Sequence, residues 1–328
     1  MKEKSSHIIV INSLRGIAAM AVVLYHFICK TVDYVQNETV LSIFHYGHKG
    51  VQLFFIISGI VIPLSLINSG YTLKKFGTFI KKRFIRIEPP YLVAVAIGIF
   101  YLIIRNYIPG TVENDLTPSF IEIILHLGYL IPFFDNVDWV NPVFWTLAVE
   151  FQYYLVLALL FPLAISSKIG LRITFYLLIA GATFLPIGMS FFPYWGAYFM
   201  VGIIYVLYLK SYVSASEFWI VSVILGIIIG YHQDFVDLVI AITAISTIHF
   251  LPNIKSKITL FLGKISYSLY LLHSIIGAAF VNYLSHIYTS PIQQVVVILG
   301  GITVSVISAY VMYRLIEKPT HNFARKIK

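Results

Sequence analysis

Residues 12–27 read NSLRGIAAMAVVLYHF, and this apolar stretch decides how the rest of the chain is interpreted. It is apolar enough to belong to a membrane span, yet it contains Arg15 and His26. Ionisable side chains are costly inside a membrane, so two of them in one segment indicate a functional site. Eleven residues make close to three helical turns, so both side chains would leave one helix face, about 16 Å apart along the axis. The alternative is an arginine that reaches back to the membrane interface and a histidine that only packs.

The composition indicates a membrane protein. Of the 328 residues, 59% are hydrophobic and 11% are charged, whereas about a quarter of the residues in a soluble domain are charged. A net charge of +9 would favour a nucleic-acid partner for a soluble protein. Here the sidedness of the basic residues explains the charge better, so no nucleic acid is expected. The single cysteine, Cys29, excludes an intramolecular disulfide and a cysteine-rich metal site.

Ten apolar segments have about the length of a membrane span and are separated by polar or Pro/Gly-marked breaks. They lie near residues 10–29, 50–68, 87–106, 143–164, 172–190, 194–209, 217–232, 235–250, 265–285 and 292–316. We therefore predict an all-α polytopic membrane protein with about ten transmembrane helices, forming one domain over residues 1–328. The first segment is long, bears ionisable groups and is followed by further spans, so it is interpreted as an uncleaved span rather than a signal peptide.

The basic residues predict the orientation of the chain in the membrane. With a cytoplasmic N-terminus, 20 of the 23 Lys and Arg residues fall on the cytoplasmic side, and the exceptions are Lys30, Lys49 and Arg105. Both termini are therefore expected in the cytoplasm, with the protein in the cytoplasmic membrane. The longest extramembrane stretch is residues 107–142. Its apolar centre, residues 120–134, is too short to span comfortably and predicts an interfacial or re-entrant piece.

A pair of arginines marks the cytoplasmic end of the third span. Arg83 and Arg86 are three residues apart and would share one face of a helix. Two guanidinium groups on one face suit a phosphorylated ligand. The alternative is an ordinary cluster of cytoplasmic basic residues that contacts lipid headgroups.

Two further ionisable residues lie deep in predicted spans. Glu150 is about two turns into the fourth span and should face a polar cavity, because an unpaired carboxylate is costly there. His26 is expected at a similar depth, and a carboxylate that supports an imidazole is a general-base arrangement; a purely structural pairing of Glu150 is the alternative. His273 is either a second pocket residue or a histidine hydrogen-bonded between helices. His45 and His48 have no carboxylate or cysteine at ligand spacing, so no metal site is predicted.

Taken together and in order, these residues resemble the motifs of the acyltransferase-3 family of integral membrane acyltransferases, and the match covers nearly the whole chain. The matching motifs are Arg15-x10-His26, residues 51–59 with Ser58, Arg83-x-x-Arg86 with Pro89, Trp145–Glu150, Ser266–His273 and Glu317-Lys318-Pro319. In the fourth motif Thr146 stands where serine is common. The chain stops at Lys328 without an extracytoplasmic hydrolase-like domain, so it resembles the stand-alone members.

The resemblance implies an O-acyltransferase that moves an acyl group, expected to be acetyl, from cytoplasmic acyl-CoA to a hydroxyl of a cell-surface carbohydrate. Such a reaction would modify a polysaccharide of the cell envelope, with membrane lipids as surroundings and no metal cofactor. The expected catalytic residues are His26 as general base and Glu150 as its support. The expected CoA-binding residues are Arg15, Arg83 and Arg86. The expected residues of the substrate pocket are Ser58, Trp145 and His273.

Two other classes of function also fit a membrane protein with buried ionisable groups. A transporter or flippase for a lipid-linked or anionic solute would use the same His, Glu and Arg residues as a solute path or proton relay. A non-catalytic partner in glycan export is the other alternative. No internal repeat and no pair of Gly/Pro-broken helices supports a transporter. Dependence on CoA separates the enzyme from both alternatives.

Overall fold

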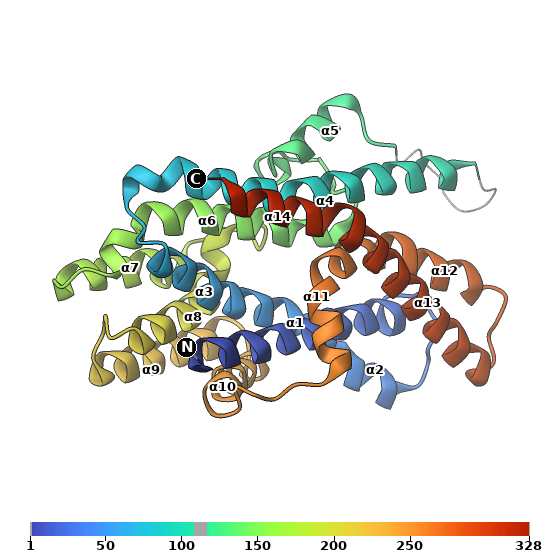
Figure 1. Cartoon of the computed structure of the whole chain (residues 1–328). Helices are drawn as coiled ribbons and strands as arrows, with labels where there is room; N and C mark the ends of the chain where they lie inside the picture. The colour runs from blue at the N-terminus through green and yellow to red at the C-terminus, as the bar shows by residue number, and fades with distance from the viewer. Residues whose placement is uncertain (1, 108–116, 328) are drawn as a thin grey trace. The chain divides into compact units, whose positions relative to one another are not determined.

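The computed structural model describes residues 2–107 and 117–327, and within these ranges every regular element is helical. The α-helices are α1 (Lys2–Cys29), α2 (Glu38–His45), α3 (Gly50–Asn68), α4 (Phe76–Asn106), α5 (Phe120–Leu127), α6 (Trp145–Ala164), α7 (Ile169–Ile179), α8 (Gly196–Leu209), α9 (Ala215–His232), α10 (Phe235–Phe250), α11 (Lys257–Leu272), α12 (Ala279–Ser285), α13 (Pro291–Met312) and α14 (Lys318–Lys326). Two π-helical turns, His273–Ala278 and Tyr313–Glu317, follow α11 and α13. The predicted all-α class is confirmed (Figure 1).

Eight helical segments in the described part of the chain are long and apolar enough to cross a membrane. They are Ile9–Cys29, Glu38–Asn68, Leu73–Asn106, Pro142–Ala164, Phe192–Leu209, Ala215–His232, Lys257–Ser285 and Pro291–Lys326. Two shorter apolar helical segments, Ile169–Phe184 and Phe235–Phe250, coincide with the two remaining predicted spans. The polytopic membrane architecture is therefore confirmed, while the count of ten and the cytoplasmic termini stay predictions.

The apolar stretch after the third span forms a short helix rather than a span. Helix α5 begins at a capping box, in which Ser119 N–H donates to Glu122 Oε2 (2.6 Å) and Glu122 N–H donates to Ser119 Oγ (3.4 Å). Beyond α5, Tyr129 is buried and its ring centroid lies 4.8 Å from that of Tyr91 on α4. The stretch therefore packs against α4, in keeping with the predicted interfacial piece. Residues 108–116 of the predicted extramembrane stretch lie outside the described residues.

The chain forms two compact units, each built from three separated segments. Unit 1 comprises Met1–Ala18, Lys49–Ile80 and Ala148–Leu260, and unit 2 comprises Ala19–His48, Lys81–Leu147 and Phe261–Lys328. Three of the predicted site residues, Arg15, Ser58 and Glu150, belong to unit 1, and the others belong to unit 2. The prediction of one domain over residues 1–328 stays a prediction.

Helices α3 and α8 form the closest packing in unit 1 (Figure 1). A methyl group on Gly59 would lie 2.2 Å from the carbonyl oxygen of Phe199, and one on Gly202 would lie 2.3 Å from that of Ile56. Small residues let two helix backbones approach in this way, which replaces the hydrophobic driving force that is missing between helices in a membrane. The ring of Tyr153 on α6 stacks on Phe199 with centroids 4.0 Å apart, so α6 packs against the same helix.

We expect Gly59→Ala to destabilise the protein by about 1–3 kcal/mol, the usual cost of overpacking a core. The blocking atom belongs to the backbone of Phe199, so no side-chain rotation relieves the contact. Thermal unfolding in detergent measures the effect. Gly170→Ala on α7 is the matched control, because no atom lies within 4 Å of its added methyl group. Equal melting temperatures for both variants would show that the α3–α8 contact is looser than described.

A charge cluster joins Lys49, the residue before α3, to the start of α10 in unit 1. Lys49, only 5% exposed, donates from Nζ to Asp234 Oδ2 (2.6 Å) and to Asp237 Oδ2 (2.8 Å). Asp234 also accepts from the backbone N–H of Asp237 and so caps α10. Although desolvation raises the pKa of Asp234, its hydrogen bonds from Lys49 and Asp237 outweigh that effect and lower the pKa below its ordinary value. One ammonium group, that of Lys49, thus pairs with two carboxylates, those of Asp234 and Asp237.

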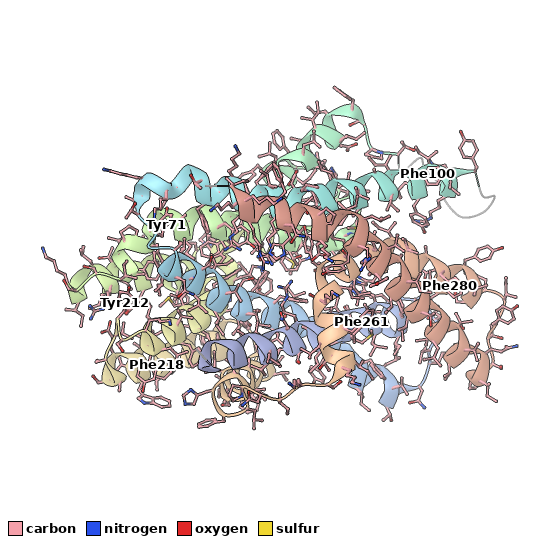
Figure 2. All side chains as sticks on the ribbon, viewed as in Figure 1. Tyr71, Phe100, Tyr212, Phe218, Phe261 and Phe280 are labelled. Atoms are coloured by element: carbon pink, nitrogen blue, oxygen red, sulfur yellow. The ribbon has the colours of Figure 1, made fainter. Side chains whose placement is uncertain are left out.

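In unit 2 one π-helical turn follows α11 and the other follows α13. Helix α12 lies against α13 (Figure 1), where a methyl group on Gly300 would lie 3.0 Å from Cε1 of Phe280. Phe280 and the 63%-exposed Phe100 are labelled in Figure 2. A large aromatic side chain that is exposed on a spanning helix suits contact with lipid. The polar residues of the site lie elsewhere in the unit.

Candidate active site

His26 and His273 lie together in unit 2. His26 belongs to α1, and His273 is the first residue of the π-helical turn that follows α11. His26 Nδ1 is 3.3 Å from His273 Nε2, and the ring centroids are 4.9 Å apart with the rings nearly edge to face. His273 is fully buried, whereas His26 is partly exposed. One imidazole is therefore enclosed by the protein, and the other keeps an accessible surface.

Backbone carbonyl groups determine which nitrogen of each ring carries the proton. His273 Nδ1 lies 2.7 Å from the carbonyl oxygen of Tyr270, and His26 Nδ1 lies 2.9 Å from that of Val22. A carbonyl oxygen only accepts hydrogen bonds, so we assign a proton to Nδ1 of both rings. His273 Nε2 is then an acceptor that faces the N–H of His26. His26 Nε2 keeps its lone pair, which is what a general base needs.

Glu150 lies on α6 in unit 1 and is held by two hydroxyl groups. Its Oε1 accepts from Ser58 Oγ on α3 (3.0 Å) and from the Tyr154 hydroxyl one helical turn away (2.5 Å). Ser58 and Glu150 are partly exposed, whereas Tyr154 is buried. The predicted polar surroundings of Glu150 are present, and the structure brings together two residues that the sequence placed on different spans.

Trp145 begins α6, and the residue after it is tied to α11. The Thr146 hydroxyl lies 3.0 Å from the carbonyl oxygen of Val143, to which it donates, and 3.1 Å from the Tyr270 hydroxyl. Thr146 is buried, as is Tyr270. The Thr146 hydroxyl therefore helps to join the motif Trp145–Glu150 to the motif Ser266–His273. Serine, which is common at this position in the family that the motifs resemble, carries the same hydroxyl group. Trp145 itself is half-buried.

The three predicted CoA-binding arginines lie on two long helices. Arg83 and Arg86 are on α4, which confirms the helical spacing that the sequence predicts for them. Arg83 is 8% exposed and Arg86 is half-buried. Arg15 is half-buried on α1, eleven residues before His26 on one continuous helix. Their joint action on one ligand stays a prediction, as does the support of His26 by Glu150.

The motif around Glu317 is joined to the motif that contains His273. Ser268 Oγ on α11 donates to Glu317 Oε2 (2.6 Å) at the end of the second π-helical turn. The sequence names Glu317 only as part of a motif and gives no signal for this hydroxyl partner. Across the described residues, no three His, Cys, Asp or Glu side chains gather as a group that could hold a metal ion.

A comparison with known protein families decides what kind of protein carries these sites. The family model described as an acyltransferase domain matches residues 8–314 of the chain. The chain belongs to the acyltransferase-3 family. The match includes all of the predicted site residues and nearly the whole of both units, so the resemblance drawn from the six motifs is confirmed.

Individual relatives of this acyltransferase carry names of one enzyme type. ORF330 of Acidianus two-tailed virus, a predicted acetyltransferase, is 27% identical over 287 residues, which cover 80% of this chain and 81% of ORF330. The O-acetyltransferase OatA of Staphylococcus aureus is 30% identical over 166 residues, which cover 48% of this chain but only 24% of OatA. No solved structure matches the chain. The chain is thus an integral membrane acyltransferase, and both of these relatives are named for acetyl transfer.

Proposed function

We propose that this acyltransferase transfers an acetyl group from acetyl-CoA, supplied on the cytoplasmic side, to a hydroxyl of a cell-surface carbohydrate. The observation that carries the proposal is the His26–His273 pair, in which His26 Nε2 has a free lone pair on a partly exposed ring. A hydroxyl is a weak nucleophile until a base takes its proton, and His26 supplies that base inside a membrane helix. The protein would act in the cytoplasmic membrane.

In the proposed reaction, the acceptor hydroxyl oxygen attacks the thioester carbonyl carbon of acetyl-CoA, and His26 Nε2 takes the hydroxyl proton. The carbon–sulfur bond then breaks, and the leaving CoA thiolate takes the proton back from His26. Free CoA and the acetyl ester are the products. While it holds the proton, His26 donates from Nδ1 to His273 Nε2, so the neighbouring imidazole orients the base. Glu150 supplies the negative charge that balances the imidazolium.

The arginines of α4 are proposed to bind the CoA phosphates, with Arg15 contributing. Guanidinium groups bind phosphates through pairs of parallel hydrogen bonds, which a diffuse surface charge does not provide. The partial burial of Arg83 and Arg86 supports a fixed site over a loose lipid contact. Ser58, Trp145 and His273 are the remaining residues proposed for the substrate pocket.

Arg83→Ala and Arg86→Ala are expected to weaken CoA binding by about 10-fold or more each, the loss of one charge-assisted hydrogen bond or more. The affinity of the detergent-purified protein for CoA measures the effect. Lys74→Ala and Lys75→Ala are matched controls, because these two exposed lysines lie just before the same helix. Equal losses in all four variants would indicate a diffuse charge effect and would count against a phosphate site.

Mass spectrometry of surface glycans tests the proposed function as a whole. Cells that lack the gene should carry glycans without the base-labile acetyl ester, and the wild-type gene should restore the ester. A gene carrying His26→Ala should restore protein in the membrane without the ester. If the glycan is instead absent from the surface of cells that lack the gene, the protein moves or assembles glycans, and the enzymatic proposal fails.

A further inference from the structure

Asn141 is a buried polar residue that no site described so far includes. It lies just before the 3₁₀ turn that leads into α6 and is 1% exposed, and both its amide nitrogen and its amide oxygen form hydrogen bonds within unit 2. Its Nδ2 donates to the carbonyl oxygen of Leu271 (3.1 Å), while its Oδ1 accepts from Ser274 Oγ (2.6 Å) and from the backbone N–H of Val143 (3.3 Å). Leu271 and Ser274 flank His273 in the sequence. The Asn141 amide therefore holds both sides of the residue that faces His26.

The turn that Asn141 holds is not a regular α-helix. At His273 the chain changes from α11 to a π-helical turn that runs to Ala278. Such turns are rare, occur mostly as single turns inside α-helices, and often lie at functional sites. On the preceding turn the Tyr270 hydroxyl lies near Thr146 Oγ and the carbonyl oxygen of Val143. The segment at residues 141–146 thus contacts α11 on both turns next to His273.

We propose that Asn141 and Ser274 are positioning residues, which set the direction of His273 and through it the hydrogen bond that orients His26. His273 Nε2 is 3.3 Å from His26 Nδ1, near the long end of hydrogen-bonding distances, so a small displacement of the turn breaks this contact. Asn141 and Ser274 lie far from His26 in the sequence, so the motif that contains His26 gives no sign of them. The inference rests on the proposed role of His26 as base, and the experiment separates the two.

A double-mutant cycle with the full-length protein tests the inference, with transfer of label from radiolabelled acetyl-CoA to unmodified surface glycan as the assay. Asn141→Ala should lower kcat by about 10²-fold, as a displaced catalytic group does, and Ser274→Ala should lower it by about 10-fold. The KM for acetyl-CoA should stay within about twofold, and Ser274→Thr should restore activity because it keeps the hydroxyl. In a His273→Gln background, Asn141→Ala should cost less than about twofold, because its effect passes through His273.

The cycle distinguishes failure of the positioning role from failure of the base. If His273→Gln is fully active, the His26–His273 contact is not part of catalysis, and the positioning role of Asn141 and Ser274 is overturned while acetyl transfer itself stands. If His273→Gln lowers kcat and Asn141→Ala lowers it by the same factor in that background as in the wild type, the two effects are independent. The proposal for Asn141 is then overturned. Ser266→Ala is the control for Ser274→Ala, because Ser266 is a buried serine on α11 that donates within its own helix, to the carbonyl oxygen of Gly263.

Amide hydrogen exchange gives a second readout that needs no activity. Ser274→Ala should speed exchange in the peptide that covers residues 271–278 and leave the peptides of α13 unchanged, because only the π-helical turn loses its partner. Ser266→Ala should leave exchange in residues 271–278 as in the wild type. Unchanged exchange in Ser274→Ala would show that the hydrogen bond from Ser274 to Asn141 does not hold the turn, and it would overturn the role proposed for Ser274.

Discussion

His26→Ala is expected to abolish acetyl transfer while the protein stays folded in the membrane. The variant removes His26 Nε2, the proposed proton acceptor, and the loss of a general base costs about 10²–10⁴-fold in rate. Folding should survive, because the ring is partly exposed and contacts one backbone carbonyl group and the rings of Tyr25 and His273.

The measurement is the transfer of radiolabel from acetyl-CoA to glycan by purified protein, alongside thermal unfolding. His286→Ala is the matched control, since His286 is an exposed histidine of the same unit. It should keep wild-type activity. Transfer at a near-normal rate by a well-folded His26→Ala protein would remove His26 from the mechanism, and with it the reason for the His273 contact.

Glu150→Gln has the second largest expected effect on kcat. The substitution removes the negative charge and leaves a side chain of nearly the same size and shape. A glutamine Oε1 still accepts hydrogen bonds from Ser58 and Tyr154, so the local structure should be retained. What disappears is the negative charge that we propose as the support of the protonated base. We expect kcat to fall by about 10²–10³-fold, the scale of removing one preorganised electrostatic group, with the melting temperature unchanged or raised because an amide is cheaper than a carboxylate in the membrane.

Tyr154→Phe and Ser58→Ala separate the charge from its surroundings. Each removes one hydrogen bond to Glu150 and leaves the carboxylate in place, so each should lose less activity than Glu150→Gln. If Glu150→Gln is instead fully active and unstable, Glu150 is a packing partner. The proposed support of His26 by Glu150 would then have to be abandoned.

The membrane-spanning architecture could be predicted from the sequence because a bilayer allows few solutions. Backbone groups in lipid must be satisfied within the segment, so a long apolar run such as residues 50–68 has to become a helix. The shorter runs were harder to judge. Residues 172–190 form α7 and a short 3₁₀ turn, Gly181–Phe184, and not one continuous spanning helix. Length alone does not say whether such a run spans.

The site was predictable one residue at a time but not as a set of contacts. An ionisable group in an apolar run stands out by its cost, which is how His26 and Glu150 were found. Apart from His273, their hydrogen-bond partners are hydroxyl groups and a backbone carbonyl, and these carry no such signal: Tyr154 is one of 23 tyrosines. Asn141 precedes Pro142 at the start of an apolar run, which marks it as a helix cap. Its bonds to Leu271 and Ser274 depend on a π-helical turn that no spacing rule reveals.

One measurement tests the central claim most directly. The full-length protein is purified, placed in liposomes and given radiolabelled acetyl-CoA together with glycan from cells that lack the gene. Our account predicts that labelled ester on the glycan and free CoA thiol appear in equal amounts, and that His26→Ala produces neither. Thiol release without labelled glycan, or equal labelling by His26→Ala, would contradict it.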